Sequence, residues 1–519
     1  MTLTAAPVTS RRRWAGLAVL SAGLLVVVMD MTVLNVALPA ITEDLRPGAV
    51  QVLWTVDVYA LVLAGLLVTF GAIGDRWGRR RLLVTGFALF GLASTVVLWA
   101  RTPDALIAVR ALLGLGGAMI MPTTLSMIRT LFADPRERAT ALGVWSAMAA
   151  VGAALGPVLG GLLLESFSWR SAFLVNVPVM VVAVVAGLLL LPESRNPHPG
   201  RWDPLGVVLS ITGMVAFVYA VKHAAKEGLA APAVPAALAV AALALGWFVV
   251  RCLRRPDPLL EIRLFGSGPF SAGVAAALAT SIAMAAMLLL LAQWMQLVQG
   301  HSPLESGLRL LPAALGAVVA SPLAPGLAAR VGARTVLAGG LAVTALGFVL
   351  LFAWAGPLGY GPVAGALALI GFGQGSLAIA SAVIMAGSPA AKAGSAAAIE
   401  ETAYELGGVL GVAVLGSVAA AVYRAELSYE GPAAGVVRES LGGALGVARE
   451  LGEAGAHLAG QARAAFTGSL VTACGAGALI MLASAVAAWL LTTRDLDLSA
   501  PAAEAGTGAR GDALSRPAP

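Results

Sequence analysis

The chain has 519 residues, of which 59% are hydrophobic and 12% are charged, and its mean hydropathy is +0.89. A soluble domain carries about 25% charged residues, so a soluble protein of this composition could not cover its own surface. Most side chains must therefore face lipid or each other. The net charge of +6 does not indicate nucleic-acid binding, because the arginines lie in short loops between apolar runs and form no single basic face.

The apolar runs, taken in chain order, predict membrane spans. The first run, from Trp14 to Pro39, is too long for a signal-peptide core of about 7–15 residues. Since a helix needs about 20 apolar residues to cross a bilayer, we expect spans at 14–39, 50–74, 82–100, 104–128, 139–164, 171–191, 204–221, 231–250, 269–298, 304–329, 335–354, 361–386, 396–423 and 467–493. The fold class is thus an all-α integral membrane protein with 14 transmembrane helices, although indistinct limits near 204–250 and 269–298 leave thirteen or fifteen open.

The arginine content of the loops predicts the orientation of these spans. Loops on one side are rich in arginine, and the positive-inside rule makes that side cytoplasmic. Its arginines are Arg11, Arg12, Arg13, Arg76, Arg79, Arg80, Arg81, Arg129, Arg136, Arg138, Arg195, Arg201, Arg251, Arg254, Arg255 and Arg263. Both chain ends are then cytoplasmic and the segment 424–466 is external. Apolar residues recur at helical spacing from Val437 to Leu451, so this segment should form amphipathic surface helices.

The spans are expected to group into two bundles. Residues 1–13 form a cytoplasmic N-terminus, 14–191 an N-terminal six-helix bundle, and 192–268 a linker with two additional helices. Residues 269–493, including the external loop 424–466, form a C-terminal six-helix bundle. The tail 494–519 is rich in Ala, Gly and Pro and is expected to be disordered and cytoplasmic.

A short internal repeat supports two related halves. The sequence DRWGRR at 75–80 follows the second span, and ARVGAR at 329–334 follows the tenth. Transporters built from two related halves bind their substrate between the halves, near the bilayer midplane.

Five acidic residues fall within predicted spans: Asp30, Asp57, Glu400, Glu401 and Glu405. A carboxylate at that depth costs several kcal/mol, so such residues usually line a cavity, find a partner or carry protons. Asp30 lies about 13 Å of helix rise before the end of its span. We expect it to bind a proton or substrate, and a purely structural hydrogen bond is the alternative.

The other acids suggest a site for a cation. Trp54 lies on the same helical face as Asp57, so a ring and a carboxylate could hold one cation between them; a hydrated charge at the outer rim is the alternative. Glu401 and Glu405 share a face and Glu400 is adjacent, so not all three can ionise in a poorly solvated site. If their span begins later than predicted, these three instead lie among lipid headgroups.

Arg110 is a lone cation deep in the fourth predicted span. An unpaired buried guanidinium would be very costly, so Arg110 must meet a carboxylate or carbonyl groups, and Asp30 is the expected partner. Protonation of the acid would loosen this pair and make the conformation sensitive to pH. A permanent structural ion pair is the alternative.

At these residues the chain resembles the fourteen-helix drug/proton antiporters of the major facilitator superfamily. The matching segments are MDMTVLNVALP at 29–39, GAIGDRWGRR at 71–80, RALLG at 110–114 and GAALGPVLGG at 152–161. Two further segments, GAMIMPTTLS at 117–126 and EETAYELG at 400–407, are similar to QacA-type quaternary-ammonium exporters. Two positions depart from the pattern: Leu113 stands where many members have Gln, and Ala329 replaces the acid of the repeated loop.

The resemblance implies two six-helix bundles plus two inserted helices, and it implies roles for particular residues. Proton coupling would fall on Asp30, Arg110, Glu400 and Glu401. Substrate binding would fall on Asp57 and Glu405, with Trp54, Met119, Met121 and Tyr404 as adaptable apolar walls. The conformational motifs would comprise Asp75, Arg76, Gly78 and Arg79 in a cytoplasmic latch, and Gly152, Gly156, Pro157 and Gly160 in an exporter helix, where glycines permit close approach and the proline permits a bend.

The predicted function is export of lipophilic cations, such as quaternary ammonium compounds and dyes, in exchange for protons across a bacterial inner membrane. Since residues 311–329 hold no acid, monovalent cations are favoured over long bis-cations. We expect no cofactor, no metal, no nucleic-acid partner and a monomer in the bilayer. A dedicated self-resistance exporter for one antibiotic is the alternative. A membrane sensor or enzyme is disfavoured, because neither a large soluble domain nor a phosphate-binding loop is visible, and uptake symport is disfavoured by residues 152–161.

Overall fold

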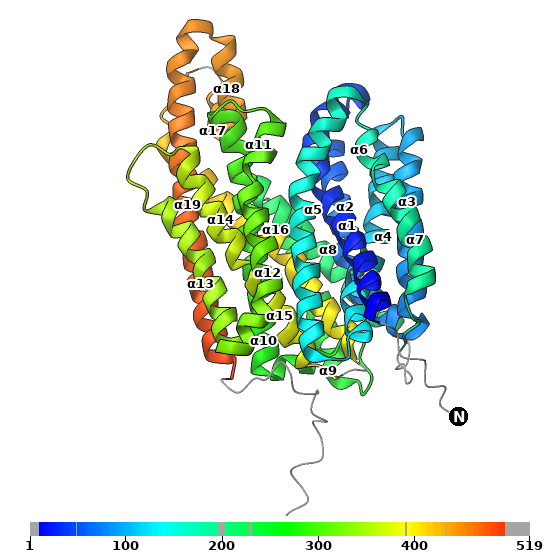
Figure 1. The fold of residues 1–519 in the computed structure, drawn as a ribbon. Coiled ribbons are helices and arrows are strands. Elements are labelled where there is room, and N and C mark those ends of the chain that lie inside the picture. The colour runs from blue at the N-terminus through cyan, green and yellow to red at the C-terminus, as the bar shows by residue number, and fades with distance from the viewer. Residues whose placement is uncertain are drawn as a thin grey trace, which may run out of the picture.

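The computed structural model describes residues 10–47, 49–195, 203–227, 231–389, 392–431 and 433–493. Most of these residues are helical and none lies in a strand, and 14 helical segments among them are long and apolar enough to cross a membrane (Figure 1). The predicted all-α membrane fold and its number of spans are thereby confirmed. The predicted tail 494–519 and most of the predicted N-terminus 1–13 lie outside the described residues.

The first six spans form one bundle around a large apolar core that includes Phe87 and Phe90. Two of its helices begin at caps: Thr102 and Asp134 each accept a backbone N–H three residues on, and a proline follows each cap. The elements of this first half are α1 (Ser10–Leu45), α2 (Ala49–Trp77), α3 (Arg79–Val96), η1 (Val97–Trp99), α4 (Pro103–Leu131), α5 (Pro135–Ser166), α6 (Ser171–Leu174) and α7 (Asn176–Leu190).

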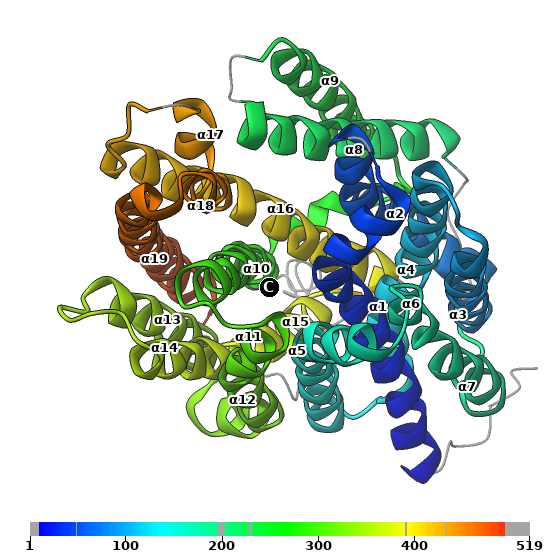
Figure 2. The same ribbon diagram turned by 90° about the horizontal axis from the view of Figure 1, so that it is seen from above.

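The two additional spans form a hairpin of α8 (Pro204–Glu227) and α9 (Ala233–Arg254). Seen from above, α8 runs past both α2 and α16 on the outside of the molecule, and α9 lies beyond it (Figure 2). Asp203 at the foot of α8 is 2% exposed and lies 2.9 Å from a guanidinium nitrogen of Arg251 and of Arg255. Burial raises the pKa of Asp203, but hydrogen bonds from Arg251 and Gly206 and the two positive charges outweigh it and hold this pKa below its ordinary value.

The second half has its own apolar core, which includes Trp294 and Phe348. A π-helical turn, a form frequent at functional sites, ends its first span. Its elements are η2 (Ile262–Gly266), α10 (Gly268–Gln293), η3 (Trp294–Val298), α11 (Pro303–Arg309), α12 (Leu311–Val331), α13 (Ala333–Phe352), α14 (Tyr360–Gly373), α15 (Gly375–Ala386), α16 (Ala393–Glu426) and α19 (Gly455–Leu491).

The segment between the last two spans folds as predicted into amphipathic helices, with one difference. Helices α17 (Ala434–Glu439) and α18 (Leu441–Glu450) are followed by η5 (Gly452–Ala454), and α18 buries Leu441, Ala444, Leu445 and Ala448 against the second half. Helix α19 begins at Gly455, although the last span was predicted to begin at residue 467. The early start lets α18 and α19 pair beyond the other helices, at the top of Figure 1.

The internal repeat has the same backbone conformation in both halves. Gly78 precedes α3 with φ of 119° and Gly332 precedes α13 with φ of 88°. Both values lie in the region that favours glycine, which explains why this residue recurs in two otherwise divergent loops.

Candidate functional site

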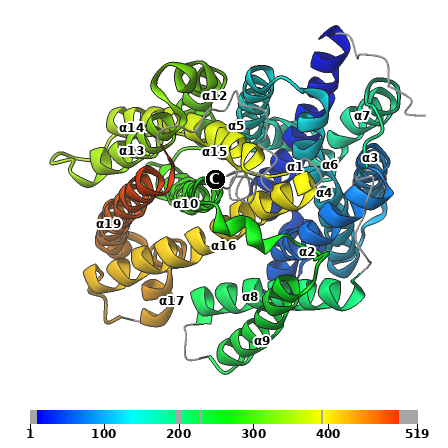
Figure 3. The ribbon, with the colours of Figure 1, turned by 90° about the horizontal axis from the view of Figure 1, so that it is seen from below.

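The two halves meet closely at the end of the molecule that carries Arg76, Arg79 and Arg129, which we call the arginine-rich end. Arg129 of α4 donates from Nη1 to Met385 O at 2.9 Å and from Nη2 to Ser388 O at 2.7 Å, so the first half binds the end of α15. Gly394, at the start of α16, packs against the carboxylate of Asp75 of α2, where a Cβ would come within 2.5 Å of the carboxylate. Seen from below, α15 and α16 lie against the first half (Figure 3).

Two of the predicted latch residues, Asp75 and Arg79, form a hydrogen-bonded network at this end. Arg79 donates to Asp75 Oδ1 from Nε at 3.0 Å and from Nη2 at 2.8 Å, and its Nη1 reaches Thr130 Oγ1 and Ser194 Oγ at 3.3 Å. Gly78 packs against the Glu193 carboxylate, where a side chain would collide. Arg76 is exposed beside this network. The network joins α2, α3 and α4, and Asp75 extends it to α16.

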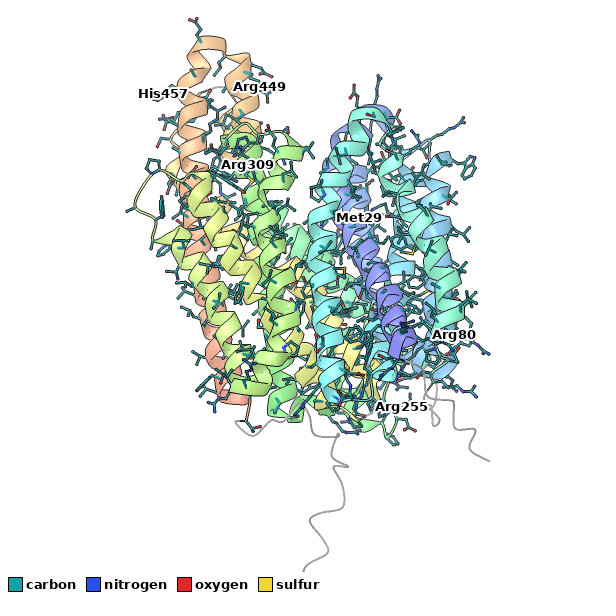
Figure 4. All side chains as sticks on the ribbon, in the orientation of Figure 1. Met29, Arg80, Arg255, Arg309, Arg449 and His457 are labelled. Carbon is teal, nitrogen blue, oxygen red and sulfur yellow. The ribbon has the colours of Figure 1, made fainter. Side chains whose placement is uncertain are left out.

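A buried ion pair lies inside the first half. Arg110 Nη1 of α4 donates to Asp30 Oδ2 of α1 at 2.8 Å, and the two side chains are 2% and 0% exposed. Asp30 is thus the partner that the sequence analysis expected. Met29, the preceding residue, lies part-way along α1 between the levels of Arg80 and Arg309 (Figure 4). The pair therefore lies well inside the span, where each charge alone would be very costly.

Three groups that the sequence analysis did not name complete this ion pair. Asn176, at the start of α7, donates from Nδ2 to Asp30 Oδ1 at 2.9 Å. Arg110 Nε donates to Thr55 O of α2 at 3.2 Å, and the Arg110 guanidinium lies 4.6 Å from the centre of the Tyr59 ring. The signal that could have found Asn176 is a lone amide in an apolar run, because polar residues at that depth need partners.

The predicted glutamates lie together on α16 between the two halves. Glu400, Glu401 and Glu405 are 4%, 3% and 7% exposed, so all three are buried inside the protein. Their neighbours Ala397 and Ala403 pack into the core of the first half.

Two serines of the second half bind this part of α16, one at a glutamate and one at the backbone beside it. The hydroxyl of Ser381 on α15 donates to Glu400 Oε1, and the backbone carbonyl of Tyr404 accepts the hydroxyl of Ser281 on α10 at 2.5 Å. Among the described residues, no ion pair joins a basic side chain to Glu400 or Glu401. Ser381 was also not named from the sequence, since a serine in a span is too common to single out.

The remaining predicted binding residues are less clearly grouped. Trp54 on α2 is 40% exposed, and the side chain of Asp57 lies outside the described part of the structure. Met121 belongs to the core of the first half, and Met119 packs against Gly86 of α3. Packing between helices accounts for both methionines, and a binding role for these residues stays a prediction.

The exporter motif makes α5 a helix that packs closely on both halves. A side chain at Gly152 would come within 2.6 Å of Leu25 O, and one at Gly156 would overlap the Thr32 hydroxyl, so these glycines let α5 approach α1. On its other side, Pro157 faces Gly307 of α11, where an added Cβ would lie 3.2 Å from the proline ring. Gly160 continues the contact with α1.

A cavity of about 510 Å³ lies elsewhere, in the second half at the end opposite the arginine-rich end. Its walls include Trp294, Trp354 and Arg463, and none of the predicted site residues lines it. An arginine in the wall would repel a cation, so we assign the candidate site to the buried charges and not to this cavity. Among the described residues, no group of three or more His, Cys, Asp or Glu side chains is placed to hold a metal ion.

The charge arrangement has a simple chemical meaning. One buried carboxylate is neutralised by an arginine, and three more gather where the halves meet without an arginine or lysine paired to Glu400 or Glu401. Opposite charges about 4 Å apart attract by about 4 kcal/mol at an effective dielectric constant of 20, more than in water. The glutamate cluster can therefore hold a proton or an organic cation.

Comparisons with known proteins identify relatives that match most of this chain. The chain is 42% identical over 485 residues to the multidrug efflux pump LfrA of Mycolicibacterium smegmatis, with 92% of this chain and 96% of that protein covered. It is 38% identical to the methyl viologen resistance protein SmvA of Salmonella typhimurium, covering 92% and 98%. It is 36% identical to the puromycin resistance protein pur8 of Streptomyces alboniger, covering 82% and 86%.

The fold is also that of a solved structure, the human organic anion transporter MFSD10. The TM-score is 0.60 at 14% identity, with 90% of this chain and 99% of that chain covered. The family model of the Major Facilitator Superfamily matches residues 20–412. The chain therefore belongs to the Major Facilitator Superfamily and is a multi-pass membrane transporter, not an enzyme.

Proposed function

We propose that this protein is a proton-coupled multidrug efflux antiporter that exports lipophilic, mainly monovalent cations from the bacterial cytoplasm. The observation that carries the proposal is the set of buried carboxylates at the meeting of the halves, Glu400, Glu401 and Glu405, together with the buried ion pair of Asp30 and Arg110 in the first half. The names of the relatives LfrA and SmvA support a drug-exporting function.

In this proposal the arginine-rich end is cytoplasmic, both chain ends are cytoplasmic, and the protein works as a monomer without a cofactor. The contacts of Arg129 and Asp75 hold that end closed, so the structure corresponds to an outward-facing or occluded state. Protons from outside neutralise Asp30 and the glutamates and release the cation. After the halves rock about α5 and α2, the acids deprotonate toward the cytoplasm and bind the next cation.

Transport in vesicles under an imposed pH gradient tests this proposal. Wild-type protein is expected to move ethidium against its gradient while protons flow the other way. Asp30→Asn and Glu401→Gln are expected to lose most of this exchange, because each removes a buried site that binds a proton. The matched control is Asp257→Asn, which neutralises an exposed carboxylate in a loop. Full exchange in both Asp30→Asn and Glu401→Gln would refute the assignment.

Transport of several different compounds in the same vesicles separates the proposed export of cations from export of a single antibiotic. The relative pur8, named for puromycin resistance, favours a dedicated self-resistance exporter for one antibiotic as the second candidate. Ethidium and tetraphenylphosphonium carry one positive charge, and methyl viologen carries two. Export of several monovalent cations supports the proposal, and stronger export of methyl viologen would refute the preference for a single charge. Export of one antibiotic alone would favour the second candidate.

A further inference from the structure

Tyr59 is a buried aromatic residue of α2 that touches the ion pair of the first half. Its side chain is 1% exposed, its ring centre lies 4.6 Å from the Arg110 guanidinium, and its hydroxyl donates to Val27 O of α1 at 3.3 Å. One turn earlier, Thr55 O accepts a hydrogen bond from Arg110 Nε. Helix α2 therefore holds Arg110 by two contacts that do not involve Asp30.

The surroundings of Tyr59 are shaped for this side chain. A Cβ at Gly114 would lie 2.6 Å from Tyr59 O, and one at Gly117 would lie 3.1 Å from the Tyr59 hydroxyl. Two glycines of α4 thus make the space in which Tyr59 lies beside Arg110. Larger residues at either position would push α2 away from α4 and separate the ring from the guanidinium.

Tyr59 also lies within range of charges from both halves. The charged groups that interact with it electrostatically are Asp30 of α1, Arg110 of α4 and Glu405 of α16. Helix α2 packs against α16, and at the arginine-rich end it carries Asp75, which packs against Gly394 of α16. The same helix therefore contacts the ion pair of the first half and the glutamate-bearing helix of the second half.

We propose that Tyr59 is a positioning residue that keeps Arg110 attached to α2 when Asp30 is protonated, and so transmits the state of Asp30 to the contact between α2 and α16. This inference rests on the proposed function as a proton-coupled antiporter. When Asp30 is ionised, the guanidinium is satisfied by the carboxylate. When Asp30 is neutral, a buried guanidinium needs other partners, and the face of an aromatic ring and a backbone carbonyl are suitable ones.

Removing the ring should therefore destabilise the state with neutral Asp30 more than the state with ionised Asp30. Tyr59→Leu leaves Arg110 with fewer partners when Asp30 is neutral, so Asp30 becomes harder to protonate. Loss of a desolvated contact between a cation and an aromatic ring should lower the pH at which Asp30 becomes protonated by about one unit. Tyr59→Phe keeps the ring and loses only the hydrogen bond to Val27, so its shift should be small.

The experiment has a spectroscopic part that does not depend on transport. Infrared difference spectra of purified protein record the carboxyl band that disappears in Asp30→Asn. In Tyr59→Leu this band should form about one pH unit lower than in wild type, and in Tyr59→Phe close to the wild-type pH. Tyr59→Met, a second variant without a ring, replaces Tyr59→Leu if that variant does not fold.

The transport part uses the same variants in vesicles. Tyr59→Leu should lose at least tenfold of its ethidium transport under a pH gradient, but keep exchange of labelled for unlabelled ethidium without a gradient. The matched control is Tyr423→Leu, since Tyr423 is a buried tyrosine whose hydroxyl also donates to a backbone carbonyl, that of Val437, at the outer end of the second half. This control should leave the infrared midpoint unchanged.

The outcomes separate the two proposals. An unchanged infrared midpoint in Tyr59→Leu overturns the role of Tyr59, whatever the transport shows. An equal loss of both kinds of transport with an unchanged midpoint assigns Tyr59 to packing alone. Wild-type protein without proton-driven transport overturns the proposed function, and the infrared midpoint still decides whether Tyr59 controls protonation of Asp30.

Discussion

Replacing Arg129 by Gln is expected to open the arginine-rich end of the protein. Arg129 is partly buried and donates two hydrogen bonds from the first half to Met385 O and Ser388 O of the second, at 2.9 and 2.7 Å. A hydrogen bond to a charged group contributes about 1.5–3 kcal/mol. Taking the lower value because the site is partly hydrated, loss of both bonds removes about 3 kcal/mol from the closed state. The closed-to-open ratio should then fall about a hundredfold.

Labelling of a buried cysteine measures this opening. Ala397 of α16 is fully buried against the first half, so a cysteine at this position should react with a membrane-impermeant maleimide only when the arginine-rich end opens. The two natural cysteines, Cys252 and Cys474, are free and buried, and both are replaced by alanine in the background. Labelling in inside-out vesicles should be much faster in the Arg129→Gln variant and intermediate in Arg129→Lys, which keeps the charge.

The control is Arg138→Gln at the same end of the molecule. Arg138 also donates two hydrogen bonds, to Phe132 O at 3.0 Å and Ala133 O at 2.8 Å, but both acceptors belong to the first half. Its loss should leave labelling unchanged. Equal labelling of wild type and Arg129→Gln, or an equal rise in Arg138→Gln, would refute the reasoning that bonds between the halves hold this end closed.

Three further predictions concern single contacts. Asn176→Ala removes the amide that donates to Asp30 at 2.9 Å, so it should weaken proton-driven transport and destabilise the protein by about 1.5–3 kcal/mol, measured by thermal unfolding in detergent. Gly156→Leu should abolish transport while the protein still reaches the membrane. The leucine side chain would collide with Thr32 and push α5 away from α1. A normal transport rate would contradict this contact. Asp203→Asn should lower Tm at pH 7, and the difference in Tm from wild type should shrink near pH 3. A carboxyl whose pKa is lowered by folding stabilises the protein above its unfolded pKa of about 4, and this stabilisation is lost as the pH falls. The same difference in Tm at both pH values would contradict the ion pairs of Asp203.

The spans and the candidate acids could be predicted because their signals are local. A run of about 20 apolar residues is enough to identify a helix in lipid. The start of α19 at Gly455 was missed because pairing with α18, and not hydropathy, extends that helix. Asp30 and Arg110 could be paired in advance because two isolated opposite charges at lipid depth need partners.

The membrane fold, the approximate number of spans, the family motifs and the candidate acids all follow from the sequence, because hydropathy and the cost of burying charge act on each segment separately. Beyond the pair of Asp30 and Arg110, the groups around these charges are set by how the helices pack. Asn176 and Tyr59 reach the ion pair from α7 and α2, and Ser381 reaches Glu400 from α15. Such partners depend on how helices distant in the chain pack and turn, and no local pattern of residues records that geometry.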